Sequence, residues 1–471
     1  MRAVTSEFGT FLPFAALHYH GSCWGGHVAD VAEPTLSTHC GHEPGRNPAA
    51  QQDRGVLSFG WQHRHRSPYR PKSVPMRKSL LFIPGPVAVS EPVLAAMAKP
   101  LINHRGPEYA RLLHSIAERM QSIFATTGDV LLLGSSGTGS LEAAVTNMFG
   151  PGDTLLACPT GVFGERIATI AKKWGCTVEV LETPWGAGVD PEALAARLRA
   201  DRENKITGIL LTHNETSTAV QIDLSAMSRA IGDHPAYVVV DSVSGLGASE
   251  FKMDEWKLDI VCAASQKALA CPPGLAIVAV SSRAWKKIKA NKAPRFYFDL
   301  QKHKEFFDKG EPPWTPPVSV AFALDVAIDL YEREGPRNVW ARHARYTDAL
   351  HQAIKALGMQ IFSRDGVHSV TVTGIVTPHG LDNKTVLTKL LDEHGVVISG
   401  GQGKMAGKMW RWGTMGVVSE ADIVAALAAF EIVIRQMGYP FKDGAAVNAA
   451  LGVFARTGKK ELQSEAASLR A

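Results

Sequence analysis

The feature that most constrains the fold is a regular alternation of short apolar runs and helix-like stretches from about residue 130 to residue 280. The apolar runs have strand length and lie at 130–133, 154–158, 177–181, 208–212, 237–240, 259–264 and 276–280. Helix-like stretches separate most of them, at 163–174, 190–199 and 223–231. This alternation predicts an α/β fold with a largely parallel sheet covered on both faces. Because ligands collect at the carboxyl ends of such strands, chemistry is expected just after these runs.

The segment PPWTPPV (312–318) interrupts this rhythm and separates a second region. That region has helical patterns at 318–333 and 337–356, a strand-like stretch at 368–376 and a closing helix at 419–437. Its pattern predicts a smaller C-terminal α+β domain. The expected organisation is an N-terminal arm and large domain over 78–325, a small domain over 326–440 and a tail over 441–471. A helix with one apolar face is also expected at 107–124.

Composition excludes several classes of protein. The 471 residues are 45% hydrophobic and 20% charged, which is ordinary for a globular enzyme. A net charge of +5 is small for this length, so nucleic acid is not an expected partner. No apolar run approaches the roughly 18 residues that a membrane span requires, so no membrane association is expected. The six cysteines show no disulfide-type spacing, which favours a reducing, cytoplasmic location.

The first 77 residues differ from the rest of the chain and carry seven of its 17 histidines. Three interpretations remain open for this segment. A metal site from His18, His20, Cys23, His39 and Cys40 would lack zinc-type spacing, so no metal is expected. A transit peptide is opposed by several interspersed acidic residues and by the absence of an amphipathic helix. The favoured interpretation is a disordered leader, or an extension upstream of a start at Met76.

Two residues with suitable chemistry follow strand-like runs in the predicted sheet. Asp241 ends the run YVVV, and Lys267 closes the triplet SQK that follows DIVCAA. Pyridoxal phosphate (PLP) chemistry requires this pair, because a lysine amine bonds the cofactor aldehyde and a carboxylate keeps the pyridine nitrogen protonated. Neither residue is decisive alone, since a strand-end Asp often caps a helix and a lysine is usually solvated.

The two motifs DSVSGLG (241–247) and SQKALACPPG (265–274) together resemble the class V, fold type I aminotransferases. The similarity is strongest to the alanine–glyoxylate and serine–glyoxylate branch and covers roughly residues 79–437. Further motifs appear in the family's order: FIPGP (82–86), HRGPEY (104–109), SSGTGSLEA (135–143), PGD (151–153), THNETST (212–218), TPPV (315–318) and KMWRWGTMG (408–416). The resemblance implies the fold of PLP-dependent transferases, with PLP held as a Schiff base on Lys267.

The resemblance also implies how the cofactor ring is held. Phe163 occupies the position at which the family stacks an aromatic ring, often Trp, and a core Phe at a helix start is the alternative. Val243 would pack on the opposite ring face. Thr216 would donate a hydrogen bond to the phenolic oxygen of the ring, and Gln266 would touch the phosphate beside the lysine.

The turn SSGTG has a physical meaning of its own, because glycine allows close approach to backbone N–H groups at a helix start. It opens a helix expected from Leu141, and the resemblance assigns the PLP phosphate to Ser136, Gly137 and Thr138. A plain strand–helix turn with a hydroxyl cap is the alternative.

Arg411 lies between two tryptophans in a segment poor in acidic residues. A guanidinium matches a carboxylate with two parallel hydrogen bonds. The resemblance assigns Arg411 to the α-carboxylate of amino and oxo acid substrates, whereas a surface arginine stacked on the aromatics is the alternative. No second arginine has a motif context that places it for a side-chain carboxylate, which disfavours aspartate or glutamate as donors.

The resemblance implies a homodimer with active sites shared between subunits. Thr315 matches a residue that reaches the partner's PLP phosphate, and the loop 103–109 is expected near the partner's site. A neighbouring tyrosine of the family is replaced at Pro312 or beside it, which puts that contact in doubt.

The implied reaction is a ping-pong transamination from alanine or serine to glyoxylate or another small oxo acid, with Lys267 as the general base. Three alternatives remain. A cysteine desulfurase would need a mobile nucleophilic cysteine, and only Cys271 lies near the lysine motif. A PLP lyase would keep the same cofactor residues. A non-catalytic subunit that keeps the fold for assembly is the third, and some family members are described beside hydrogenases.

Overall fold

The computed structural model describes residues 79–468, with side chains to Arg456. All of these residues belong to one compact unit. The expectations for the leader at 1–77, including its histidines and Met76, lie outside the described residues. Within the described range, the structure contains no helix that is long and apolar enough to cross a membrane.

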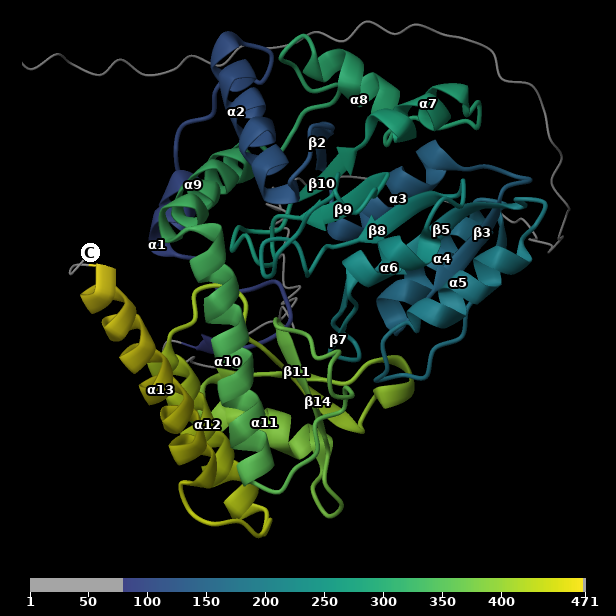
Figure 1. Cartoon of the computed structure of the whole chain (residues 1–471). Helices are drawn as coiled ribbons and strands as arrows, with labels where there is room; N and C mark the ends of the chain where they lie inside the picture. The colour runs from purple at the N-terminus through teal and green to yellow at the C-terminus, as the bar shows by residue number, and fades with distance from the viewer. Residues whose placement is uncertain (1–78, 469–471) are drawn as a thin grey trace, which may run out of the picture. The chain divides into compact units, whose positions relative to one another are not determined.

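A seven-stranded sheet forms the centre of the large domain (Figure 1). Its strands run in the order β2-β10-β9-β8-β5-β3-β4. Their bounds are β2 Asp129–Gly134, β3 Thr154–Cys158, β4 Thr177–Val180, β5 Ile206–Thr212, β8 Tyr237–Asp241, β9 Ile260–Ala264 and β10 Leu275–Val280. Only β10 runs antiparallel to its two neighbours, so β2 runs in the same direction as the remaining strands. The α/β fold class with a mostly parallel sheet is confirmed.

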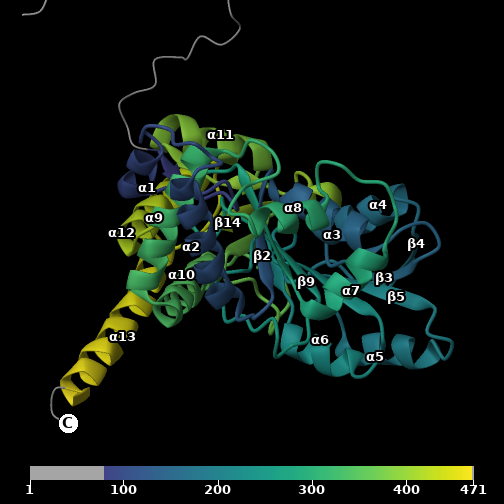
Figure 2. The same ribbon diagram turned by 90° about the horizontal axis from the view of Figure 1, so that it is seen from above.

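Successive residues of the strands face two separate apolar cores. Val239 faces the first core, and its neighbours Val238 and Val240 face the second. The first core is covered by α3 (Gly137–Met148), α4 (Val162–Lys173) and α7 (Ser282–Ala290). The second is covered by α2 (Pro107–Phe124), α5 (Pro191–Ala200), α6 (Leu224–Ile231) and α9 (Val318–Glu334). Figure 2 shows α3 and α4 on one side of the sheet and α5 and α6 on the other. Near-continuous apolar runs are therefore needed in the central strands, because both faces are buried.

The small domain has its own core around a three-stranded sheet of order β11-β14-β13. These strands span Val372–Val376, Met409–Gly413 and Ser399–Gly400 for β11, β14 and β13. The helices of this domain are α10 (Pro336–Ala356), α11 (Asn383–His394), α12 (Glu420–Gln436) and α13 (Ala445–Ser468). The remaining elements are α1 (Glu91–Ala96), α8 (Leu300–Phe307), the short strands β6 (Asn214–Glu215) and β7 (Val220–Gln221), and a 3-10 turn at Gly403–Met405.

An N-terminal arm runs from the small domain to the large one. Its strand β1 (Leu80–Leu81) pairs in parallel with β12 (Val396–Val397). The backbone of Phe82 then accepts a hydrogen bond from the N–H of Gly413, at 2.7 Å. The arm therefore reaches the large domain while it is bonded to two strands of the small one.

Two elements differ from the sequence-based expectations. Helix α3 begins at Gly137 instead of Leu141, so the glycine-rich turn forms the first turn of the helix. Part of the 441–471 segment, expected as a tail, forms α13, and its Ala446, Ala450, Val453 and Phe454 are buried in the small-domain core.

Candidate active site

The predicted cofactor residues other than Thr315 gather at one edge of the large sheet. They follow the carboxyl ends of five strands that run in the same direction. Ser136, Gly137 and Thr138 follow β2, Phe163 follows β3, Thr216 follows β5, Asp241 and Val243 lie at the end of β8, and Gln266 and Lys267 follow β9. This is the edge at which parallel α/β sheets bind ligands.

The amine of Lys267 lies against the N-terminal arm. Its Nζ atom donates a hydrogen bond to the Pro84 carbonyl oxygen, at 2.6 Å. A Cβ atom at Gly85 would lie 2.6 Å from the same Nζ, so a larger residue there would displace the lysine side chain, and the φ of +125° is one that other residues rarely adopt. Burial lowers the pKa of Lys267 to about 8, Asp241 opposes this shift, and Arg411 and Arg166 add to it. Near neutral pH, a larger fraction of this amine is therefore neutral and nucleophilic than in an ordinary solvated lysine.

Asp241 is a buried carboxylate with an exposed fraction of only 5%. Its Oδ1 atom accepts a hydrogen bond from the backbone N–H of Val243, at 3.0 Å. Burial raises the pKa of Asp241 to about 7; the Val243 N–H opposes this shift, Glu215 adds to it, and Lys267 and Arg166 oppose it. A cation beside this carboxylate would stabilise its ionised form.

The glycine-rich turn is tightly packed against the end of β8. A Cβ atom at Gly137 would lie 2.9 Å from each methyl carbon of Val243. Ser136 is the N-cap residue of α3, but its side chain makes no capping hydrogen bond. The hydroxyl of Thr138 accepts a hydrogen bond from Nη1 of Arg166, at 3.1 Å. The helix start and its hydroxyl groups are arranged as an anion site requires.

Phe163 is held in place by the carboxylate of Glu215, which lies in the short strand β6 just after β5. Glu215 is fully buried, and its Oε2 atom accepts hydrogen bonds from the N–H groups of Phe163 and Gly164, at 2.9 and 3.0 Å. Its Oε1 atom accepts from the N–H and the hydroxyl of Ser217, at 3.0 and 2.6 Å. Glu215 therefore fixes the first turn of α4, which carries Phe163, to the loop after β5.

Arg411 enters the site from β14 of the small domain and is 6% exposed. Its Nη1 atom donates to the Thr216 carbonyl at 3.2 Å, and its Nε atom donates to the Gly400 carbonyl at 2.8 Å. The flanking Trp410 and Trp412 instead pack into the small-domain core, each with its ring 5.7 Å from that of Phe430. The alternative of a surface arginine with stacked aromatics is therefore excluded.

Thr315 is exposed and lies outside this group of residues. It lines a surface cavity of about 400 Å³ together with Leu101, His104 and Pro316. The structure thus brings together the two segments that were expected to face a partner subunit.

Three residues that bond within this site were not singled out from the sequence: Pro84, Arg166 and Glu215. Pro84 and Glu215 lie inside the quoted motifs FIPGP and THNETST, and Arg166 lies three residues after Phe163. These motifs mark the segments, but they do not show which neighbouring residues the side chains reach.

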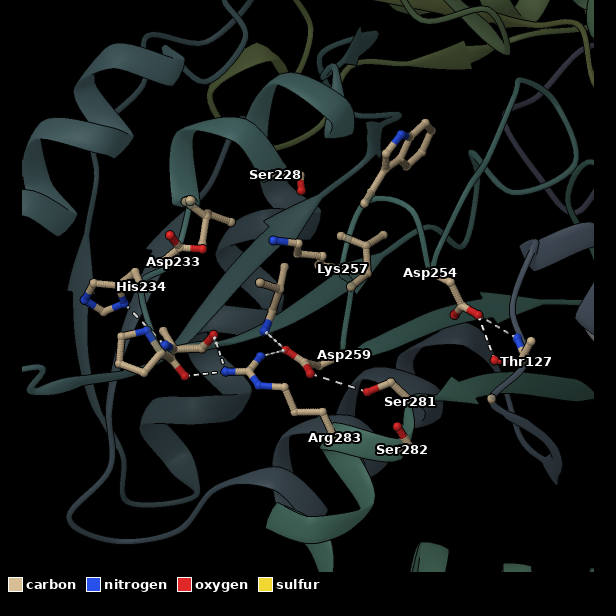
Figure 3. Close-up of a pocket in the computed structure, with 18 residues that line it drawn as sticks. Thr127, Ser228, Asp233, His234, Asp254, Lys257, Asp259, Ser281, Ser282 and Arg283 are labelled. Atoms are coloured by element: carbon tan, nitrogen blue, oxygen red, sulfur yellow. Dashed lines mark hydrogen bonds and ion pairs between the residues drawn. The ribbon is translucent and has the colours of Figure 1, made fainter.

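A second cavity, of about 630 Å³, lies at the opposite edge of the sheet (Figure 3). It adjoins Val238 near the start of β8 and Asp259 just before β9. Its main cation, Arg283, donates to Asp259 at 2.6 Å and to the Ala236 carbonyl at 3.2 Å. None of the predicted site residues lines this cavity. Among the described residues, no group of three or more His, Cys, Asp or Glu side chains is arranged to hold a metal ion.

The fold and the site define a class of enzyme, and the family comparison agrees. Residues 94–418 match the family Aminotransferase class-V, so the chain belongs to this family. It is an aminotransferase, and its cofactor is pyridoxal phosphate.

The chain is also similar to several named proteins. The chain is 36% identical to the L-aspartate–glyoxylate aminotransferase of Paracoccus denitrificans, over 79% of this chain and 94% of that one. It is 35% identical to the serine–glyoxylate aminotransferase of Arabidopsis thaliana, with the same two coverages. It is also 36% identical to a protein named soluble hydrogenase 42 kDa subunit in Anabaena cylindrica, over 80% of this chain and 99% of that one.

A solved structure shows the same fold. The pyridoxamine–pyruvate aminotransferase of Mesorhizobium loti superposes with a TM-score of 0.78 at 31% identity, over 82% of this chain and 99% of that one.

The residues of the site fit pyridoxal phosphate. The side-chain amide of Gln266 has a buried end without a hydrogen-bond partner within the described residues, and its NH2 group is the end that can donate to a phosphate oxygen. A lysine amine, a buried carboxylate and a free helix N-terminus meet the requirements of the aldehyde, the ring nitrogen and the phosphate.

Proposed function

We propose that this enzyme transfers an amino group from a small amino acid, alanine or serine, to glyoxylate or another small oxo acid by a ping-pong mechanism. One arrangement carries the proposal: Asp241 and Lys267 follow the ends of the paired strands β8 and β9, and the buried Arg411 donates to the Thr216 carbonyl in the loop after β5. The names of the relatives from Paracoccus and Arabidopsis support glyoxylate as the acceptor.

The roles of the residues follow from their chemistry. Bound pyridoxal phosphate supplies an aldehyde for the amino group and a ring that withdraws electrons from the substrate. Lys267 would hold the cofactor between turnovers, and its neutral amine would act as the general base toward the proton on the substrate Cα. The negative charge of Asp241 would keep the ring nitrogen protonated.

The remaining contacts hold the cofactor in place. Phe163 and Val243 would enclose the two faces of the ring, and Thr216 would donate to its phenolic oxygen. Ser136, Gly137 and Thr138 would hold the phosphate at the start of α3, and Gln266 would contact it from the lysine side.

Arg411 binds the α-carboxylate that amino acids and oxo acids share. Its guanidinium is already oriented by hydrogen bonds to the carbonyl oxygens of Thr216 and Gly400, so little side-chain entropy is lost when a substrate binds. One arginine can therefore serve both halves of the reaction.

The enzyme is proposed to act as a homodimer, with Thr315 on the phosphate of the partner's cofactor. Exposed apolar side chains support this, since Leu101 is 71% and Phe296 72% exposed. The ring of Phe296 stacks on Trp314, at 4.8 Å between centroids. Tyr297 donates to the Gly134 carbonyl at 3.1 Å, which links this aromatic group to the start of the phosphate turn.

A cytoplasmic location is proposed because Cys158, Cys176, Cys262 and Cys271 are buried, unpaired thiols. Such thiols are typical of a reducing compartment.

The desulfurase alternative is disfavoured by the state of Cys271. This side chain is 1% exposed, and burial raises the pKa of its thiol to about 12. A mobile nucleophile instead requires an accessible thiolate.

Two measurements test the proposal. Borohydride reduction of the yellow holoenzyme followed by peptide mapping should place the pyridoxyl label on Lys267, and a label elsewhere, or none, would overturn it. Donor alone should then convert the cofactor to a stable colourless amino form with release of one oxo acid. Continuous turnover without an acceptor would instead identify a lyase. A colourless protein whose biological role survives Lys267→Ala would identify a non-catalytic subunit.

A further inference from the structure

A second guanidinium lies within the candidate active site. Arg166 is half-buried on the first turns of α4. Its Nη1 atom donates to the hydroxyl of Thr138 at 3.1 Å, and its Cζ atom lies 4.6 Å from the centroid of the Phe163 ring. Arg166 therefore contacts both the proposed phosphate turn and the ring proposed to stack on the cofactor.

The charges of Arg166 and Arg411 both lower the pKa of the same amine, that of Lys267. Burial is the main cause that lowers the pKa of Lys267, and the charges of Arg411 and Arg166 lower it further. The charge of Arg166 also lowers the pKa of Asp241, against the larger raising effect of burial. The reacting end of the site is thus flanked by one guanidinium from the small domain and one from α4.

Arg166 takes part in none of the ion pairs found among residues 79–456. Other half-buried arginines have carboxylate partners: Arg197 pairs with Glu179, and Arg342 pairs with Glu334. A half-buried guanidinium without a carboxylate partner is costly unless a ligand supplies the anion. Its one hydrogen bond in this structure, to a neutral hydroxyl, leaves most of its five N–H groups free for such a ligand.

We infer that Arg166 binds an anionic group of a ligand in this site, either the cofactor phosphate or the distal carboxylate of a dicarboxylic donor. Both anions present oxygens that match the guanidinium fork. The inference rests on the proposed function and deepens it, because the second source would extend the donor range from alanine and serine to amino acids of the aspartate type. It also supplies the second arginine that the sequence alone did not place.

The test uses two variants and a matched control. Arg166→Gln removes the charge, and Arg166→Lys keeps the charge but loses the fork. Lys172→Gln removes one charge from an exposed position on the same helix. For each protein, pyridoxal phosphate is titrated into the apoprotein by absorbance, with and without inorganic phosphate as a competitor. The kcat/KM values of the holoenzyme are then measured for alanine and for aspartate with glyoxylate.

If the anion is the phosphate, Arg166→Gln should weaken cofactor binding about tenfold or more, which corresponds to about 1.4 kcal/mol. Competition by inorganic phosphate should weaken in parallel. If the anion is the distal carboxylate, cofactor binding should stay unchanged while kcat/KM falls about tenfold for aspartate and not for alanine. In either case Arg166→Lys should recover only part of the loss, and Lys172→Gln should match the wild type.

The inference is overturned if Arg166→Gln changes neither quantity, or if kcat/KM falls equally for both donors while cofactor binding is unchanged. It is also overturned if cofactor binding is unchanged and the wild type does not use aspartate. Failure of the proposed function would show differently, as a wild-type protein that transaminates no donor, and the cofactor and phosphate titrations would remain interpretable in that case.

Discussion

At the scale of single residues, Asp241 is a carboxylate of the site with a strongly raised pKa. Its pKa is about 7 in the folded protein without cofactor, against an ordinary value of 3.8, because the side chain is buried. A raised folded pKa contributes stability that is present below about pH 4 and is lost as the pH rises through about 7. The ionised carboxylate therefore costs stability at neutral pH until a cofactor supplies the opposite charge.

Replacing Asp241 with Asn should separate stability from activity. The apoprotein of Asp241→Asn should melt at a higher temperature than the wild type at pH 8, and this advantage should shrink toward pH 5. Its transamination rate should fall by orders of magnitude, because the carboxylate acts mainly in the carbanion-like transition state. Thermal melts at the two pH values and stopped-flow half-reactions check this. Asp392→Asn, on an exposed face of α11, is the control and should show no such pH-dependent gain.

Arg411→Ala should keep the yellow cofactor and raise KM for every amino and oxo acid. The physical reason is the loss of charge-assisted hydrogen bonds to the shared α-carboxylate, which are worth about 1.5–3 kcal/mol, or roughly ten- to a hundredfold. Steady-state kinetics with several donors and acceptors measure it. Loss of cofactor from the purified variant would show that Arg411 is not a substrate residue.

The residues that could be predicted from the sequence are those that stand at fixed offsets from a strand end. Lys267 and Asp241 both follow apolar runs that are recognisable by composition, so their shared edge of the sheet follows from the topology. Arg166 and Glu215 act through side chains that reach across to other elements. Their partners, Thr138 and the backbone of α4, depend on how the helices pack, which spacing alone does not determine.

At the scale of elements, one carboxylate connects α4 to the loop after β5. Glu215 accepts four hydrogen bonds from both segments, and the adjacent Thr216 carbonyl accepts from Arg411. The ring of Phe163 and the guanidinium of Arg411 are therefore positioned through consecutive residues of one short segment.

Glu215→Gln should weaken cofactor affinity and raise KM together. The amide nitrogen cannot accept the two N–H groups of α4, and each unsatisfied buried group costs about 1–3 kcal/mol. Cofactor titration, near-UV circular dichroism of the bound cofactor and steady-state kinetics measure the effect. Glu165→Gln, at an exposed position of α4, is the control and should leave the cofactor affinity, the circular dichroism signal and KM unchanged. An unchanged cofactor signal in Glu215→Gln would contradict this positioning role.

Two kinds of element were predicted correctly: helices whose apolar periodicity extends over many residues, and strands formed by short, fully buried apolar runs. Helix α2 occupies 107–124 as expected, and each predicted strand of the large sheet is present. The start of α3 was predicted too late because Gly and Ser are weak helix formers, although helix packing and the need for free N–H groups place them in the first turn. Helix α13 was not predicted because two of its four buried positions are alanines, which give little apolar contrast.

At the scale of the whole molecule, two exposed apolar side chains lie near Thr315: Leu101 lines the same cavity, and Phe296 stacks on the adjacent Trp314. If this surface joins two subunits, Phe296→Asp and Leu101→Asp should each shift the protein from dimer to monomer and reduce cofactor retention. The reason is that a buried, unpaired carboxylate at an interface is strongly unfavourable. Sedimentation velocity and light scattering measure the change. Leu391→Asp, at a 48% exposed leucine of the small domain, is the matched control. Monomeric wild-type enzyme with full activity would contradict the shared site.

The arm that carries Pro84 has a consequence for how long the enzyme remains usable. Its strand is hydrogen-bonded to β12 of the small domain, and a few residues later its carbonyl holds the amine of Lys267. Opening of the small domain would thus free the lysine from its restraint at the same time as it withdraws Arg411. Stabilising the helices α10–α13 of the small domain should therefore slow the loss of colour on heating, although Lys267 itself lies in the large domain.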